Sequence, residues 1–368
     1  MGPIFYCTGR AHVASRELAR ASPQFGARAE GIVPMRAWQF SSFGLDSLEF
    51  VERPTPTPGP GEVLVGVRAI SLNYRDLLVV RGQYNPHMHL PRIPCSDGAG
   101  EVVAVGEGVT VWKPGDRVAG IFMQNWLDGP LTRIRARGAL GGDVDGMLTD
   151  YVVLRETGLV AIPDHLSFQE AATLPCAAVT AWNALVTGDL KPGSTVLIQG
   201  TGGVSIFALQ FAKLRGARVL GISSSNGKLE RARSMGLDAG LNYRETPNWE
   251  RWVLDQTGGE GVDLVVEVGG AGTLARSLQS IRFGGTIAQI GVLTESADPF
   301  PVPLLLHKVA RIQGIYVGSR RDFVQMNRAI ALAELRPVGE EFHWSQTREV
   351  LARLEEGSHL GKMVLTVG

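Results

Sequence analysis

Cysteine is scarce in this sequence, and several other features are missing. Three scattered cysteines, Cys7, Cys95 and Cys176, cannot form a disulfide framework, which favours a reducing compartment. No run approaches about 18 consecutive apolar residues, so no membrane-spanning helix is predicted. Lys plus Arg and Asp plus Glu both number 36, and this balance excludes the basic footprint of a nucleic-acid-binding protein. These absences predict a cytoplasmic protein without a membrane or nucleic-acid partner.

The first 34 residues differ in composition from the rest. They are rich in Ala, Arg and Ser and lack the apolar core of a secretory signal. We expect a disordered extension over residues 1–34 ahead of a natural start at Met35, and a transit-like leader is the alternative. The whole chain has 368 residues, 44% of them hydrophobic, which suits one large or two medium domains.

Two sequence patterns divide the remaining chain and predict the α/β class. Residues 62–160 form short β-rich segments separated by glycines, which predicts a compact, partly barrel-like domain. Residues 176–318 alternate apolar strands with helices, which predicts a parallel sheet covered on both faces. The strands are expected at 195–200, 217–223, 239–243, 262–269, 285–291 and 311–318, as in a six-stranded Rossmann unit. We place the first domain at 35–175 and the Rossmann domain at 176–318, and we expect 319–368 to return to the first.

The stretch VLIQGTGGVS, residues 196–205, predicts a dinucleotide-binding turn. Gly200 permits the tight turn, and Gly202 lets the backbone approach a pyrophosphate. Gly203 and Val204 open the following helix, whose first amides face the phosphates. Ser205 stands where such turns have Gly or Ala, but its side chain is nearly as small as that of alanine. An ordinary strand-to-helix turn is the alternative, and the six-strand context favours the dinucleotide site.

The end of the second Rossmann strand predicts which dinucleotide binds. An acidic residue about 20 positions after the turn accepts a hydrogen bond from the free ribose hydroxyl of NAD. Here the sequence has Ser223 to Ser225 followed by Lys228, with neither Asp nor Glu. Hydroxyls and a lysine suit the 2′-phosphate of NADP(H), because they donate to it and do not repel it. A solvated Lys228 without a ligand is the alternative interpretation.

Several motifs jointly resemble the medium-chain dehydrogenase/reductase superfamily, in its zinc-independent, quinone-oxidoreductase-like branch. They are SLNYRDLLVVRGQY, PCSDGAGEVVAVGEGVTVWKPGDRV, LPCAAVTAWNAL, VLIQGTGGVS and LNYRE. The resemblance runs from Met35 to the end. It implies a GroES-like catalytic domain, a Rossmann domain inserted before the C-terminal segment, and a homodimer that pairs through the last Rossmann strand.

The resemblance also implies that no metal is bound. Asn73 and Ser96 stand where zinc-dependent relatives have a cysteine and a histidine ligand, and only Cys176 matches a ligand position. A lone thiolate is not a zinc site. The four-cysteine lobe that holds structural zinc in those relatives has no counterpart, because residues 132–153 contain no cysteine.

Family positions further imply a set of cofactor contacts. Thr180 would touch the nicotinamide amide, and Gly291 and Val292 would line the nicotinamide ring. Lys362 matches a basic residue near the pyrophosphate. Ser224, Lys228 and Tyr243 match residues around the 2′-phosphate in NADPH-using quinone reductases.

The expected reaction is hydride transfer from NADPH to a quinone or an α,β-unsaturated carbonyl compound. Without zinc, the negative charge on the carbonyl oxygen needs hydrogen-bond donors, and Asn73 and Tyr84 are the candidates. Leu78 replaces a tyrosine common in quinone-reducing relatives, which leaves an NADP-dependent alcohol dehydrogenase or ketoreductase as an alternative. A non-catalytic NADPH-binding protein is an alternative of another class.

Overall fold

The computed structural model describes residues 34–295 and 299–368. The extension expected over residues 1–34 lies outside this part, apart from Pro34, which begins strand β1 (Pro34–Phe40). No helix in the described ranges is long and apolar enough to cross a bilayer. All elements named below belong to one unit, Pro34–Gly368.

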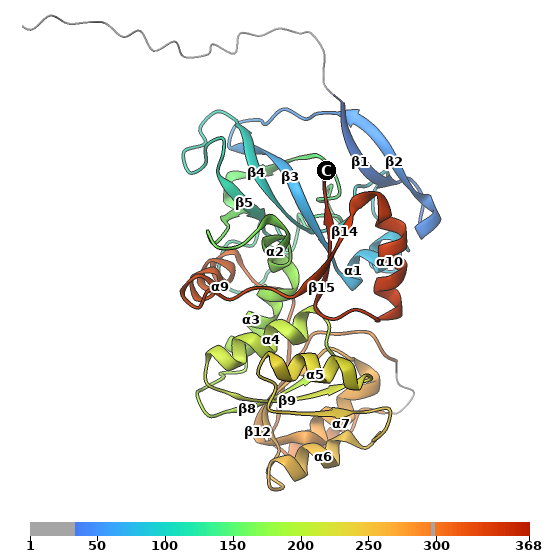
Figure 1. Ribbon diagram of the computed structural model, residues 1–368, viewed down its shortest axis with the longest axis vertical. Coiled ribbons are helices and arrows are strands. Elements are labelled where there is room, and N and C mark those ends of the chain that lie inside the picture. The colour runs from blue at the N-terminus through green and yellow to red at the C-terminus, as the bar shows by residue number, and fades with distance from the viewer. Residues whose placement is uncertain (1–33, 296–298) are drawn as a thin grey trace, which may run out of the picture. The chain divides into compact units, whose positions relative to one another are not determined.

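Six parallel strands form the Rossmann sheet in the spatial order β10–β9–β8–β11–β12–β13 (Figure 1). They are β8 (Thr195–Gln199), β9 (Arg218–Ser223), β10 (Ala239–Asn242), β11 (Val262–Glu267), β12 (Ile281–Gln289) and β13 (Arg311–Gly314). The strand order reverses between β8 and β11, and ligands of such folds bind outside the carboxyl ends of the strands at this point. The predicted α/β class and Rossmann sheet are confirmed.

Helices connect the parallel strands and cover the sheet. They are α4 (Gly203–Leu214), α5 (Asn226–Ser234), α6 (Trp249–Gln256), α7 (Ala271–Ser280) and α8 (Val302–His307). Ile206, Phe207 and Phe211 of α4 are buried, so this helix presents an apolar face to the core. Covering helices bury both faces of the sheet, which explains why its strands are continuous apolar runs.

The GroES-like domain is built on a second sheet, in the order β14–β15–β3–β4–β5–β7, with β6 paired to β3. Its strands are β3 (Glu62–Leu72), β4 (Asp97–Val105), β5 (Arg117–Gly120), β6 (Tyr151–Arg155), β7 (Leu159–Ala161), β14 (Gly339–His343) and β15 (Lys362–Thr366). Strand β15 lies antiparallel to β3, so residues near the chain end return to the first domain, and Figure 1 shows red β15 beside blue β3.

Short elements complete this domain. Strand β1 pairs with β2 (Leu48–Pro54), and single 3-10 turns occupy Leu45–Ser47, Glu156–Gly158 and Trp344–Gln346. The helices outside the strand connections of the Rossmann sheet are α1 (Tyr74–Val80), α2 (Phe168–Ala172), α3 (Val179–Thr187), α9 (Arg320–Leu332) and α10 (Thr347–Glu356). Of these, α3 packs on α4. A π-helical turn, Leu174–Ala178, joins α2 to α3 and carries Cys176.

Candidate functional site

The glycine loop lies at the carboxyl end of β8, where the strand order reverses. Gly200 has a φ of 68°, and a Cβ added at Gly200 or Gly202 would meet no atom within 4 Å. The loop is therefore open to a ligand that approaches its backbone. Gly202 caps α4, whose first amides face the same space. The Ser205 hydroxyl donates to the carbonyl oxygen of Gln199 at 2.6 Å, which explains how serine is accommodated there.

The residues predicted to surround a 2′-phosphate lie at the carboxyl ends of β9 and β10. Ser224 follows β9 and Tyr243 follows β10, and the Tyr243 N–H donates to the carbonyl oxygen of Ser223 at 3.0 Å. Lys228 lies in the first turn of α5, and its Nζ donates to the carbonyl oxygen of Gly357 at 2.7 Å. Burial lowers the pKa of Lys228. The structure thus brings the three predicted side chains to one edge of the sheet.

A segment between α10 and β15 runs beside the glycine loop. The N–H of Gly361 donates to the carbonyl oxygen of Thr201 at 2.9 Å. His359 lies in the same segment, and its Nδ1 has no hydrogen-bond partner among the described residues. Burial and the neighbouring charges of Lys362 and Lys228 lower the pKa of His359 to about 4. His359 is therefore neutral at pH 7 and offers this space a hydrogen-bonding nitrogen without a charge.

One buried carboxylate, that of Glu267, fixes the backbone at the carboxyl ends of β8 and β11. Its Oε1 accepts from the N–H groups of Gly269 at 2.8 Å and Gly270 at 3.0 Å. Its Oε2 accepts from Nε2 of Gln199 at 2.6 Å, at the end of β8. Glu267 was not predicted from the sequence, although a charged residue at the end of the apolar run VDLVV is a signal for a buried carboxylate. The network positions the backbone where a nicotinamide is expected.

The residues predicted at the nicotinamide lie on α3 and after β12, and these two elements are in contact. A Cβ added at Gly291 would lie 1.6 Å from the carbonyl oxygen of Val268, so only glycine fits there. Val292 is exposed, whereas Thr180 is buried in the first turn of α3. Contact with a nicotinamide stays a prediction for all three residues.

Lys362 forms the centre of a buried polar cluster. Its Nζ donates to the carbonyl oxygen of Leu72 and to Oδ1 of Asn73, both at 2.5 Å. An ammonium cannot accept a hydrogen bond, so the Asn73 oxygen must face it. The Nδ2 of Asn73 has no hydrogen-bond partner among the described residues. The stem of Lys362 passes Gly203, but its charge is directed to Asn73 and not to the expected pyrophosphate position.

The positions compared with zinc ligands have other partners. Oδ1 of Asp97 accepts from the Ser96 hydroxyl at 2.7 Å, and its Oδ2 accepts from the Cys176 N–H at 3.0 Å. Burial raises the pKa of Asp97, and Lys362 opposes this shift. Burial also raises the pKa of the Cys176 thiol, which disfavours the thiolate that binds metals.

These residues do not fit a zinc site. The oxygen of Asn73 already faces an ammonium, and Ser96 offers a hydroxyl that is engaged with Asp97. Across residues 34–295 and 299–368, no three His, Cys, Asp or Glu side chains are grouped so that they could hold a metal ion. Catalytic zinc requires three protein ligands of these types.

Tyr84 belongs to a group that we call the arginine–aromatic cluster: Arg75, Tyr84, Phe122 and Tyr316. The Arg75 guanidinium carbon lies 4.9 Å from the centre of the Tyr84 ring and 4.7 Å from that of Phe122. The hydroxyls of Tyr84 and Tyr316 are in hydrogen-bond contact. Of these four residues, Tyr84 alone was predicted from the sequence. A basic residue next to Asp76 and Leu77, which are buried in α1, was a signal for Arg75.

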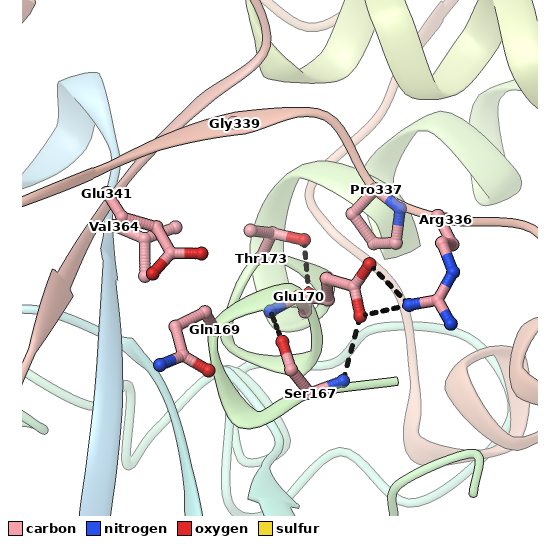
Figure 2. A pocket seen from close by; sticks show the side chains of 9 residues that line it. All are labelled: Ser167, Gln169, Glu170, Thr173, Arg336, Pro337, Gly339, Glu341 and Val364. Atoms are coloured by element: carbon pink, nitrogen blue, oxygen red, sulfur yellow. Dashed lines mark hydrogen bonds and ion pairs between the residues drawn. The ribbon is translucent and has the colours of Figure 1, made fainter. Parts of the chain in front are cut away.

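A surface hollow beside α2 and β14 holds none of the predicted site residues. Figure 2 shows the nine residues that line it, Ser167, Gln169, Glu170, Thr173, Arg336, Pro337, Gly339, Glu341 and Val364. The Arg336 guanidinium pairs with Glu170 at 2.9 Å, and Glu170 also caps α2 with Ser167. Because Glu170 and Arg336 pair with each other, the hollow offers little for a ligand.

Comparisons with known proteins match both parts of the chain. Residues 203–331 match the family described as zinc-binding dehydrogenase, and residues 59–164 match the alcohol dehydrogenase GroES-like domain. A zinc-type alcohol dehydrogenase-like protein of Schizosaccharomyces pombe is 43% identical over 333 residues, which cover 88% of this chain and 96% of that protein.

Solved structures of oxidoreductases also match the chain over most of its length. An NAD-dependent alcohol dehydrogenase is 34% identical with a TM-score of 0.84, and the match covers 91% of this chain and 100% of the other. The quinone oxidoreductase of Coxiella burnetii is 26% identical with a TM-score of 0.74, and the match covers 91% of this chain and 100% of the other.

Proposed function

The chain belongs to the medium-chain dehydrogenase/reductase superfamily, and from this premise we propose that it is an NADPH-dependent, zinc-independent reductase of quinones or α,β-unsaturated carbonyl compounds. The observation that carries the proposal is the hydrogen bond from Lys362 Nζ to Asn73 Oδ1. It directs a cation toward the position that holds a metal ligand in zinc-dependent relatives. The family is an oxidoreductase family, so the open questions concern the metal, the cofactor and the substrate.

The preference for NADPH rests on charge at the carboxyl ends of β9 and β10. Ser224 can donate, Lys228 carries a positive charge, and Arg244 lies near enough to lower the pKa of Lys228 further. The opposing charge of Glu340 raises the pKa of Lys228, and Glu340 pairs with Arg353 at 3.0 Å. A relative is named NAD-dependent, but the stretch from Ser223 to Lys228 has no carboxylate to capture a free ribose hydroxyl.

The protein's own residues would position the substrate and stabilise the developing charge. NADPH supplies a hydride when bound. The hydrogen bond from Lys362 fixes the orientation of the Asn73 amide. Its Nδ2 and the Tyr84 hydroxyl would donate hydrogen bonds to the substrate carbonyl oxygen as negative charge builds there. The open backbone of Gly200 and Gly202 would hold the pyrophosphate. Thr180, Gly291 and Val292 would contact the nicotinamide.

An assay of NADPH consumption with a quinone, an enone and a ketone tests the proposal. Oxidation with the quinone or the enone supports it. Oxidation with the ketone alone supports the ketoreductase, which the alcohol dehydrogenase names of relatives and the replacement by Leu78 favour. NADPH binding without oxidation by any of the three would indicate a non-catalytic binding protein.

Metal analysis of the purified protein should find no stoichiometric zinc, and a chelator should leave activity unchanged. The physical reason is that Asn73, Ser96 and Cys176 supply no set of three anionic or imidazole ligands. About one zinc per chain, together with activity that is lost on its removal and restored on its return, would show that the zinc-independent assignment is wrong.

We also propose that the chain forms a homodimer through β13, the edge strand of the Rossmann sheet. Large apolar side chains are exposed on and around the neighbouring α8, namely Phe283, Val302, Leu306 and Val309. An unpaired edge with an adjacent apolar surface tends to associate with another chain. A second copy would cover both features by symmetry.

Leu306→Glu should convert the dimer to a monomer, because it places a charge on the apolar surface beside the edge strand. Leu306 is 79% exposed, so the substitution disturbs little inside one chain. Light scattering at micromolar concentration measures the result. Leu332→Glu is the matched control, since Leu332 is 89% exposed at the end of α9, outside the Rossmann sheet. A monomeric parent protein, or a dimer that survives Leu306→Glu, contradicts this interface.

A further inference from the structure

Arg75 carries a guanidinium edge, beside Gly142, that has no hydrogen-bond partner within residues 34–295 and 299–368. Its side chain is 10% exposed. Nη1 donates to the carbonyl oxygen of Leu140 at 2.6 Å, whereas Nε and Nη2 are buried without a hydrogen-bond partner among the described residues. The carboxylate of Asp76 lies 3.9 Å from Nη1, which is too far for a hydrogen bond. Buried charged donors without partners destabilise a fold, so this pair of atoms requires an explanation.

The free edge has the geometry of a carboxylate site. The Nε–H and one N–H of Nη2 point in the same direction, so they can hold the two oxygens of a carboxylate by parallel hydrogen bonds. The rings of Tyr84 and Phe122 hold the guanidinium at 4.9 and 4.7 Å. Tyr316 adds its ring edge-on to Phe122 at 6.3 Å. Aromatic surroundings exclude water, which strengthens an ion pair formed there.

The position of Arg75 connects this edge to the proposed reaction site. Arg75 follows Asn73 by two residues at the start of α1. The Nδ2 of Asn73 also lacks a well-aligned partner, although the Asn73 amide lies close enough to Asp97 to lower the pKa of that carboxyl group. The hydroxyls of Tyr84 and Tyr316 come from two distant segments and are in hydrogen-bond contact beside this arginine, and both tyrosines are partly exposed.

We propose that the Nε–Nη2 edge of Arg75 binds a carboxylate of the substrate, so that the preferred substrates are α,β-unsaturated carbonyl compounds that carry an acid group. This inference rests on the proposed function and names the substrate class of the same site. For 4-oxopent-2-enoate, hydride from NADPH adds to one carbon of the C=C bond. A proton from water adds to the other carbon, and the products are 4-oxopentanoate and NADP⁺.

The test compares 4-oxopent-2-enoate with its methyl ester, which has the same reacting bond but no charge. The parent protein should favour the acid about ten- to a hundredfold in kcat/KM, as a charged bidentate contact implies. Arg75→Met should lower this ratio by about the same factor. Arg75→Lys keeps the positive charge but lacks the two parallel N–H donors of the guanidinium, so its acid-to-ester ratio of kcat/KM should be intermediate. Arg321→Met, at an exposed ion pair with Asp128, is the control that keeps the parent ratio.

A binding measurement separates this inference from the proposed function. Calorimetry with 4-oxopentanoate and NADP⁺ measures binding without turnover. Both Arg75→Met and Arg75→Lys should weaken the binding of 4-oxopentanoate. If no substrate is reduced but Arg75 still controls this binding, the proposed function fails and the carboxylate site stands. An acid-to-ester ratio near one in the parent protein overturns the inference. The inference is also overturned if a folded Arg75 variant binds 4-oxopentanoate as tightly as the parent protein does.

Discussion

Replacement of Lys228 by alanine should weaken NADPH binding about ten- to a hundredfold and leave NADH binding nearly unchanged. The 2′-phosphate is the only group that distinguishes the two cofactors, and Lys228 is the cation at the predicted position for it. A hydrogen bond to a charged group contributes about 1.5–3 kcal/mol, which sets this range. In the structure Lys228 Nζ donates to the carbonyl oxygen of Gly357, so NADPH must redirect an existing bond. This places the expected effect near tenfold.

Fluorescence titration with both cofactors measures this effect, and the difference between them is the result that matters. Loss of the contact with Gly357 would disturb both cofactors equally, so a structural role for Lys228 is recognisable. Lys191→Ala is the matched control, because Lys191 is an exposed lysine before the amino end of β8 and pairs only with Asp189 among the described residues. Equal weakening of NADPH and NADH by Lys228→Ala, or a parent protein that binds both equally, contradicts the NADPH assignment.

Lys362→Met should lower the free energy of unfolding by about 3 kcal/mol at neutral pH. The substitution removes two hydrogen bonds from an ammonium that is 4% exposed. It also removes the charge that favours the ionised form of Asp97, whose carboxylate is fully buried. Urea denaturation of both proteins measures the difference.

The pH dependence of this loss follows from the sign of the shift at Asp97. Burial already raises the folded pKa of Asp97, and loss of Lys362 would raise it further. A carboxyl group whose pKa is raised in the folded state contributes stability below its unfolded pKa. That contribution is lost as pH rises through the folded pKa. The destabilisation should therefore grow from acid to neutral pH.

Two further variants check the cause of this effect. Lys362→Arg keeps the charge and should cost less than Lys362→Met. Adding Asp97→Asn to Lys362→Met should recover part of the stability, since an asparagine can still accept from the Cys176 N–H without a charge. A loss that is the same at every pH, with no recovery in the double variant, would mean that packing of the stem and not charge explains the effect.

The fold was predictable because its signals are local. Each buried parallel strand is a continuous apolar run, and Gly200 marks the turn where β8 ends. The same locality placed Ser224 and Tyr243 at the ends of neighbouring strands. Parallel strands have their carboxyl ends at the same edge of a sheet, so the proximity of Ser224 and Tyr243 could be predicted although they are far apart in sequence.

The charged interior was not predictable, because its partners are distant in the chain. Lys362 could be placed near the glycine loop, but its hydrogen bond to Leu72 joins residues 290 positions apart. The arginine–aromatic cluster likewise needs Tyr316, from the segment after β13, to meet Tyr84. Helix propensity and periodicity carry no information on such contacts. Glu267 is a different case, since a carboxylate in an apolar strand could have been recognised as a buried hydrogen-bond acceptor.

The place of β15 between β14 and β3 has a consequence for how the protein forms during synthesis. Strand β3 emerges from the ribosome early, but its neighbour β15 is translated only after the whole Rossmann sheet. The nucleotide-binding part can thus fold while the GroES-like part still has an unpaired, apolar strand edge. An unpaired apolar edge of this kind tends to pair with other chains, so it is a hazard for aggregation until translation passes Thr366. Nascent chains halted before Lys362 should therefore contain a protease-resistant core made of the Rossmann sheet alone.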